Sequence, residues 1–148
     1  MSEEEIAAFL EEERVAIVSS FGPRGWPHSM PLWYLVRDGR ILAWTFRKSQ
    51  KVKNLERDPR ATVLVEAGYD SYGDLRGVMF ECETKMHSDT DLVADFGLEL
   101  AGRYAPEGQE PPPQALDAFR AQAPKRVVLE FLPIHTISWD HRKLGGAY

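Results

Sequence analysis

The chain has 148 residues, of which 43% are hydrophobic and 28% charged, so it has the composition of one folded domain over 1–148 rather than of a disordered or fibrous chain. The net charge of −5 disfavours a general nucleic-acid-binding domain, which is usually basic. The apolar runs are too short for a membrane span, and the acidic N-terminus is unlike a secretion signal, so we expect a cytoplasmic protein with no membrane partner.

The first part of the chain predicts one helix followed by a meander of three strands. Ser2 and Glu5 have capping-box spacing ahead of an apolar stripe, which is typical of a helix start. The β-rich runs after it are joined by turn signals, and Arg37-Asp38-Gly39 is the strongest hairpin signal in the chain. The expected elements are a helix over 2–13 and strands over 14–21, 29–36 and 40–46.

The rest of the chain predicts further short helices and strands. Ser49 is a plausible N-cap for a helix that Asp58-Pro59 ends, and Cys82 falls on the apolar face of an alternating strand, which favours a core role over a nucleophile. Pro133 implies a bend or bulge between the two last strands. The expected elements are strands over 61–67, 75–86, 125–132 and 134–139, and helices over 49–58, 90–103 and around 116–119, with a loop over 106–113. Six or seven antiparallel strands with three or four helices indicate a mainly β fold, a small barrel with peripheral helices.

The basic segment 47–60 is the most informative candidate site. It carries six basic and two acidic side chains in an acidic protein. Arg47 and Lys48 precede a helix that opens at Ser49, with Lys51 in its first turn, so a phosphate there would meet unpaired N–H groups, a hydroxyl and cations. The same spacing also fits a solvated basic helix face, and both interpretations stay open.

Two other classes of site receive less support. The four histidines lack the spacing of metal ligands, so no metal site is expected. Trp33 and Trp44 precede the basic segment and offer flat apolar surfaces for a planar ring, although each could equally fill a barrel core.

The stretch from Gly25 to Gly68 resembles the flavin-binding split β-barrel superfamily typified by pyridoxamine 5′-phosphate oxidase. It is similar to the family pattern P-[LV]-W-[FY], then G-x-I on the next strand, then [ST]-x-x-x-S-x-K-x-x-N-[LI]-x-x-[DN]-P. Residues 75–78, LRGV, and 138–146, SWDHRKLGG, also look similar to small members of this group. The resemblance implies a split β-barrel and a homodimer that binds FMN, or the deazaflavin coenzyme F420, at the subunit interface.

Carried over residue by residue, the resemblance implies three groups of contacts. The phosphate contacts are Arg47, Ser49, Gln50 and Lys51. The residues lining the ring are Met30, Pro31, Leu32, Trp44 and Thr45. The substrate contacts are Trp33, Trp139, His141 and Arg142. The chain is short for pyridoxamine phosphate oxidation, which makes that substrate doubtful.

The expected function is therefore a flavin-nucleotide-dependent oxidoreductase that transfers a hydride to or from a small planar unsaturated substrate. In that case the cofactor carries the redox chemistry and the protein binds, orients and excludes water. One alternative is a non-catalytic flavin or haem carrier, which binds cofactor without turnover. Another is a nucleic-acid module built on the basic helix, which the overall acidity disfavours.

Overall fold

The computed structural model describes residues 1–109, 111–112 and 114–145. Four α-helices accompany seven strands in this part of the chain. The helices are α1 (Glu3–Glu12), α2 (Gln50–Arg57), α3 (Thr90–Tyr104) and α4 (Ala115–Gln122). The strands are β1 (Ala16–Phe21), β2 (Pro27–Leu32), β3 (Leu35–Arg37), β4 (Arg40–Phe46), β5 (Arg60–Ala67), β6 (Arg76–His87) and β7 (Arg126–Asp140). The expected loop over 106–113 and the motif 138–146 each extend into residues outside this description.

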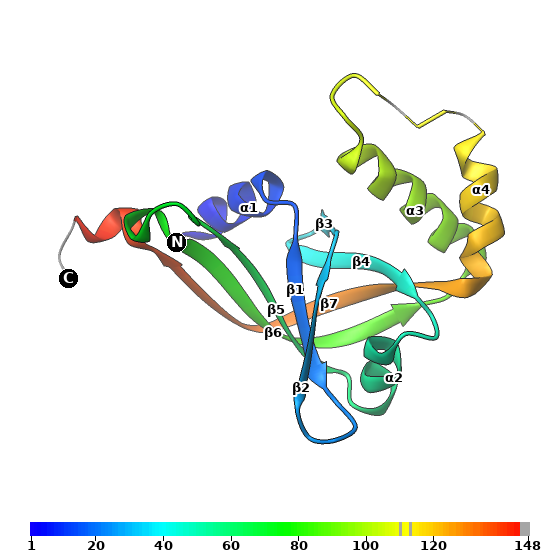
Figure 1. The fold of residues 1–148 in the computed structure, drawn as a ribbon, viewed down its shortest axis with the longest axis horizontal. Coiled ribbons are helices and arrows are strands. Elements are labelled where there is room, and N and C mark those ends of the chain that lie inside the picture. The colour runs from blue at the N-terminus through cyan, green and yellow to red at the C-terminus, as the bar shows by residue number, and fades with distance from the viewer. Residues whose placement is uncertain (110, 113, 146–148) are drawn as a thin grey trace.

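The strands form one antiparallel sheet in the order β2-β1-β5-β6-β7-β4-β3. The sheet curls on itself into a split barrel, with α1 over one opening and the α3–α4 hairpin against the outside (Figure 1). The two longest strands are β6 and β7. The register between them shifts between Glu81 and Cys82, close to Pro133. The mainly β, split-barrel class expected from the sequence is confirmed.

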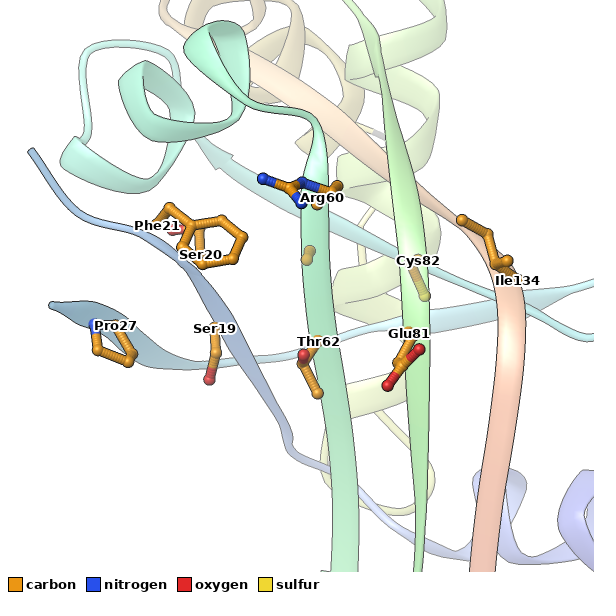
Figure 2. A pocket seen from close by; sticks show the side chains of 10 residues that line it. Ser19, Ser20, Phe21, Pro27, Arg60, Thr62, Glu81, Cys82 and Ile134 are labelled. Atoms are coloured by element: carbon orange, nitrogen blue, oxygen red, sulfur yellow. The ribbon is translucent and has the colours of Figure 1, made fainter. Parts of the chain in front are cut away.

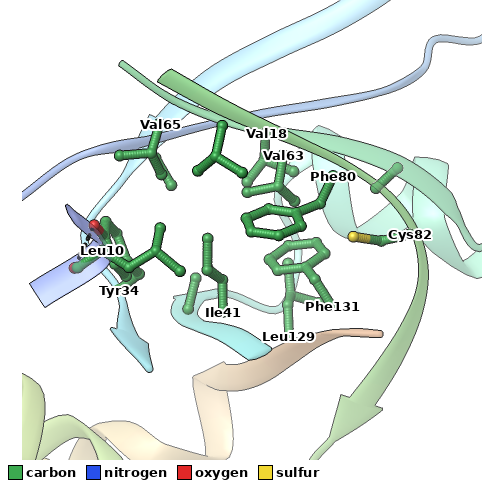
Figure 3. Packing of buried hydrophobic residues seen from close by; sticks show 14 of the residues in the cluster. Leu10, Val18, Tyr34, Ile41, Val63, Val65, Phe80, Cys82, Leu129 and Phe131 are labelled. Atoms are coloured by element: carbon green, nitrogen blue, oxygen red, sulfur yellow. Dashed lines mark hydrogen bonds between the residues drawn. The ribbon is translucent and has the colours of Figure 1, made fainter. Parts of the chain in front are cut away.

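Two apolar clusters hold these layers together. The larger fills the barrel, where Val63, Phe80 and Phe131 are almost fully buried (Figure 3). The smaller lies between the outside of β4 and β7 and the α3–α4 hairpin, and it includes Leu42 and Phe96. Strand β4 therefore contributes alternate side chains to two different cores, because successive residues of a strand point to opposite faces.

Local signals located most elements well. The Ser2–Glu5 capping box is present, with both reciprocal hydrogen bonds. The Arg37–Arg40 hairpin turns through Asp38 and Gly39, both with positive φ, as its sequence predicts. Among the described residues, no helix is long and apolar enough to span a membrane.

Two strand predictions were wrong. The expected strand over 29–36 is broken at Trp33 and Tyr34, so β2 and β3 lie at opposite edges of the sheet instead of forming a meander. The break has a clear cause: Tyr34 is fully buried and its hydroxyl donates to the carbonyl oxygens of Leu10 (2.8 Å) and Glu13 (3.0 Å). The two strands expected around Pro133 are one continuous strand, β7, with a local irregularity.

Candidate functional site

The basic segment forms the turn from β4 into α2. Arg47 donates its backbone N–H to the carbonyl oxygen of Lys125 at 2.9 Å, which fixes the turn against the start of β7. Ser49 occupies the N-cap position, but its side chain makes no capping hydrogen bond. The first turn of α2 contains no acidic residue, so its positive dipole end has no carboxylate of its own helix to neutralise it.

Lys51 is the most unusual residue of this turn. Only 9% of it is exposed, and its Nζ donates to Thr45 Oγ1 at 3.1 Å. Burial lowers the pKa of the Lys51 ammonium below its usual range. Ser49 Oγ is also buried and has no hydrogen-bond partner among the described residues. A cation and a hydroxyl held out of water in this way form a site suited to an anion such as phosphate.

Asn54 anchors α2 to the barrel, and the sequence interpretation gave it no role beyond a place in the family pattern. It is fully buried, and its Nδ2 donates to Ser20 Oγ at 3.1 Å while its Oδ1 accepts from Gln50 Nε2 at 2.8 Å. The signal that pointed to it is its place on the buried stripe of α2, among Lys51, Val52 and Leu55. The Gln50 side chain therefore hydrogen-bonds to Asn54, the residue that anchors α2.

The expected ring-lining residues do not all lie together. Met30 pairs with Val18 and Leu32 with Ala16, so these two share the barrel face of the sheet, whereas Pro31 points to the outside. Thr45 is buried beneath Lys51.

Trp44 lies on the other face of β4. Because β4 alternates, its ring lies on the face opposite Thr45, packed edge-on against Phe119 of α4 with 5.7 Å between ring centroids. In this chain Trp44 packs against the helical hairpin, away from Lys51, and its ring-lining role stays a prediction.

The expected substrate contacts are spread over the molecule. Trp33 stacks on Tyr104 with ring centroids 4.3 Å apart, although 54% of it is exposed. The C-terminal residues of the expected site lie at the end of the molecule remote from α2 (Figure 1). There Trp139 covers Gly77 so closely that a Cβ on that glycine would come within 2.3 Å of the indole ring. A single chain does not bring this C-terminal group to Lys51.

In that C-terminal segment, His141 donates from Nδ1 to the Tyr72 carbonyl oxygen at 3.1 Å. Arg142 makes two hydrogen bonds to the Asp140 carboxylate. The Arg142 guanidinium holds the pKa of Asp140 well below its usual range, at about 2. Both side chains are thus engaged in local contacts.

The outer face of the sheet carries a cavity of about 600 Å³. Phe21, Arg60, Glu81 and Ile134 surround it (Figure 2). Cys82 also lines it but is 3% exposed, and burial raises the pKa of its thiol to about 12, which fits a core residue. Large apolar side chains are exposed on this face, including Ile134 at 68% and Ile137 at 41%.

Comparison with solved structures identifies several similar proteins. A conserved hypothetical protein from Mycobacterium tuberculosis is 38% identical, with a TM-score of 0.87 over 100% of this chain and 90% of that one. An F420 reductase is 22% identical (TM-score 0.65, 88% of this chain, 94% of that one). The heme storage protein HutZ from Vibrio cholerae is 13% identical (TM-score 0.68, 93% of each chain). The last two likenesses concern the fold alone.

Comparison of sequences gives a match at the level of the family. No curated protein sequence matches the chain. The family model described as pyridoxamine 5′-phosphate oxidase matches residues 2–139, which is nearly the whole chain and includes β2, β4 and α2. The chain therefore belongs to the pyridoxamine 5′-phosphate oxidase family.

Proposed function

We propose that this protein is a flavin-nucleotide-dependent oxidoreductase that holds the phosphate of its cofactor at the N-terminus of α2. The observation that carries the proposal is the buried Lys51 ammonium, which donates to the Thr45 hydroxyl. Two residues before it, the buried Ser49 hydroxyl has no hydrogen-bond partner in the part of the chain that the structure describes. A buried polar group without a partner destabilises a free protein, so such a pair is best explained by a ligand that supplies the missing contacts.

The residues present fit the phosphate of FMN or of F420. Lys51 and Arg47 would supply charge, and Ser49 Oγ together with the first N–H groups of α2 would supply donors. Met30 and Leu32 would bound the ring on the barrel side of β2. The bound cofactor would supply the hydride chemistry, and the protein would orient the ring and exclude water. No general base of the protein is needed for such a step.

We further propose that two subunits complete the site. The end of β7 and the short 3-10 helix after it, His141–Leu144, lie remote from α2 in the same chain (Figure 1). Trp139, His141 and Arg142, which these elements carry, would therefore reach the cofactor from a second copy. The apolar outer face that carries Ile134 and Ile137 is suited to self-association, because exposed apolar surface of this kind commonly marks an interface.

The test is a titration of cofactor-free protein with FMN and, separately, with F420, followed by tryptophan and ring fluorescence. Tight binding of either one, followed by turnover with a reductant and a quinone-like acceptor, is the expected result. Binding of neither refutes the proposal.

The second candidate, a non-catalytic flavin or haem carrier, is favoured by the similarity in fold to a heme storage protein. The same titration with haem separates the two candidates. Haem binding without flavin binding favours the carrier, and flavin binding without turnover under any reductant and acceptor pair favours a flavin carrier.

A further inference from the structure

Trp33 is an exposed aromatic residue whose ring the fold holds in place. It lies in the break between β2 and β3, and 54% of it is exposed. Its indole stacks on the Tyr104 ring of α3, with 4.3 Å between the ring centroids and 10° between the ring planes. Because one face is covered and more than half of the side chain is exposed, the other face of the indole is open to solvent. We call the Trp33 indole and the Tyr104 ring beneath it the aromatic platform.

Tyr104 is fixed by its hydroxyl group and by packing. The hydroxyl accepts from the Tyr34 backbone N–H at 2.9 Å and donates to the Arg14 carbonyl oxygen at 2.7 Å. Tyr104 is also the last residue of α3, where it packs against the smaller apolar cluster. Since Tyr34 directly follows Trp33, one tyrosine fixes both the plane of the indole and the backbone beside it.

The end of α3 is in turn anchored to the end of α1. Arg103 Nη2 donates to the carbonyl oxygens of Leu10 (2.8 Å) and Glu13 (3.2 Å), and Arg14 Nη1 donates to the Arg103 carbonyl oxygen at 2.7 Å. All three acceptors are backbone groups, so the anchor joins the two helices directly. The aromatic platform is therefore positioned before any ligand binds, which lowers the entropy that a ligand must lose there.

An indole face that is both open and fixed suits a planar ligand. Covering Tyr104 accounts for one face of the Trp33 ring and leaves the other without a role. The faces of an indole carry negative charge density, so a ring that is poor in electrons stacks on it most favourably. Trp33 directly follows Leu32, which we propose to bound the cofactor ring, and consecutive Cα atoms are about 3.8 Å apart. A ligand on the platform therefore lies beside the strand proposed to line the cofactor.

We infer that the aromatic platform binds the planar substrate by stacking, and that Tyr104 is the positioning residue that holds the indole for it. This inference rests on the proposed function. It narrows the substrate class to flat, electron-poor rings such as quinones, because an unsaturated chain without a ring gains little from stacking. Reduction of a quinone takes two electrons and two protons from the reduced cofactor, which is oxidised, and yields the hydroquinone.

The experiment uses menadione, a methylated naphthoquinone, as the probe. Its Kd is measured by equilibrium dialysis against protein loaded with the oxidised cofactor, and its KM and kcat are measured with the reduced cofactor. Trp33→Ala removes the indole, Tyr104→Leu removes the ring beneath it, and Tyr104→Phe keeps that ring without the hydroxyl.

Leu116→Ala is the control for a loosened helical hairpin. Leu116 packs against the same apolar cluster as Tyr104 but is not part of the aromatic platform. This variant should lower the free energy of unfolding and leave the Kd of menadione unchanged.

Trp33→Ala should raise the Kd and the KM of menadione by about 2- to 12-fold, the fold-change that corresponds to one aromatic stack. Tyr104→Leu should raise both constants as well, whereas Tyr104→Phe should stay within about 2-fold of the wild type because its ring remains stacked. The kcat should change little in all three variants, since stacking holds the substrate and the transition state alike. Cofactor affinity should also be unchanged.

Several results would overturn the inference. A wild type that binds its cofactor but not menadione would do so and would leave the proposed function standing. Unchanged menadione affinity in Trp33→Ala, at an exposed residue, or in a folded Tyr104→Leu protein would do so too. An equal loss in Leu116→Ala would reduce Tyr104 to a structural residue. Failure of both FMN and F420 to bind would instead refute the proposed function, and this inference with it.

Discussion

Replacing Lys51 by methionine tests the phosphate site most directly. Methionine keeps much of the apolar stem but removes the ammonium, whose protein partner is Thr45 Oγ1 at 3.1 Å. A charge-assisted hydrogen bond contributes about 1.5–3 kcal/mol, so cofactor affinity should fall by about 10- to 150-fold. The variant should still fold, because the desolvation penalty of the buried charge disappears together with the hydrogen bond. Its free energy of unfolding without cofactor should stay within about 1 kcal/mol of the wild type at pH 7.

The pH dependence of the same variant gives a second readout. Burial lowers the pKa of Lys51 in the folded protein, while the unfolded chain keeps the ordinary value of 10.5. Between these two values the unfolded state binds more protons, so this residue makes the cofactor-free wild type more stable as pH rises. The affinity for phosphate should instead fall as pH rises, because Lys51 loses the positive charge that attracts the phosphate. Both pH effects of Lys51 should be absent from the methionine variant.

The assay combines cofactor titration with urea unfolding followed by tryptophan fluorescence. Lys53→Met is the matched control, since residues two apart on a helix point in different directions and Lys53 is exposed whereas Lys51 is buried. It should change affinity by less than about 3-fold. Wild-type affinity in a folded Lys51→Met protein, or an equal loss in both variants, would refute the role of Lys51.

Three further predictions follow from single contacts. Ser49→Ala should weaken cofactor binding by about 0.5–1.5 kcal/mol in the same titration yet barely change the stability of the free protein, since the Ser49 hydroxyl has no capping bond to lose; a clear loss of stability would contradict this. Tyr34→Phe should lower the free energy of unfolding in urea by about 1 kcal/mol. The loss stays this small because Arg103 still donates to the two carbonyl groups that accept from the Tyr34 hydroxyl. An unchanged urea midpoint would count against this prediction. Ile137→Asp should convert the proposed dimer into monomers in sedimentation velocity, since it places a charge in the apolar interface. A wild-type protein that is already monomeric would refute the proposed interface.

The sequence predicted best what depends on neighbouring residues. The capping box at Ser2, the turn at Asp38-Gly39 and the bend at Pro133 are local signals, and each has its structural counterpart. The break between β2 and β3 was missed because it depends on the Tyr34 hydroxyl reaching carbonyl groups near the end of α1, a contact between distant parts of the chain.

The arrangement of the candidate site was predictable only in part, for the same reason. The order of Arg47, Ser49 and Lys51 along the chain indicated a phosphate site, and the structure places Lys51 over Thr45. The direction of Trp44 was open to prediction, since it is adjacent to Thr45 on one strand and must point to the other face. Lys125 could not be assigned to this region from sequence, because only the pairing of β4 with β7 brings it beside Arg47.

Without a ligand, the turn from β4 into α2 holds several polar groups in arrangements that do not favour the stability of the folded protein. The N-cap Ser49 makes no cap, Lys51 keeps a charge where burial opposes it, and Arg47 has no ion pair among the described residues. Asn54 nevertheless holds the helix firmly against Ser20, so the arrangement is not a consequence of loose packing. Segments in which local preferences conflict with a well-packed fold are commonly functional, because binding resolves the conflict. A phosphate-bearing ligand should therefore raise the free energy of unfolding of this protein, and this increase should be much smaller in Lys51→Met. One measurement thus links the folding of the turn to its function.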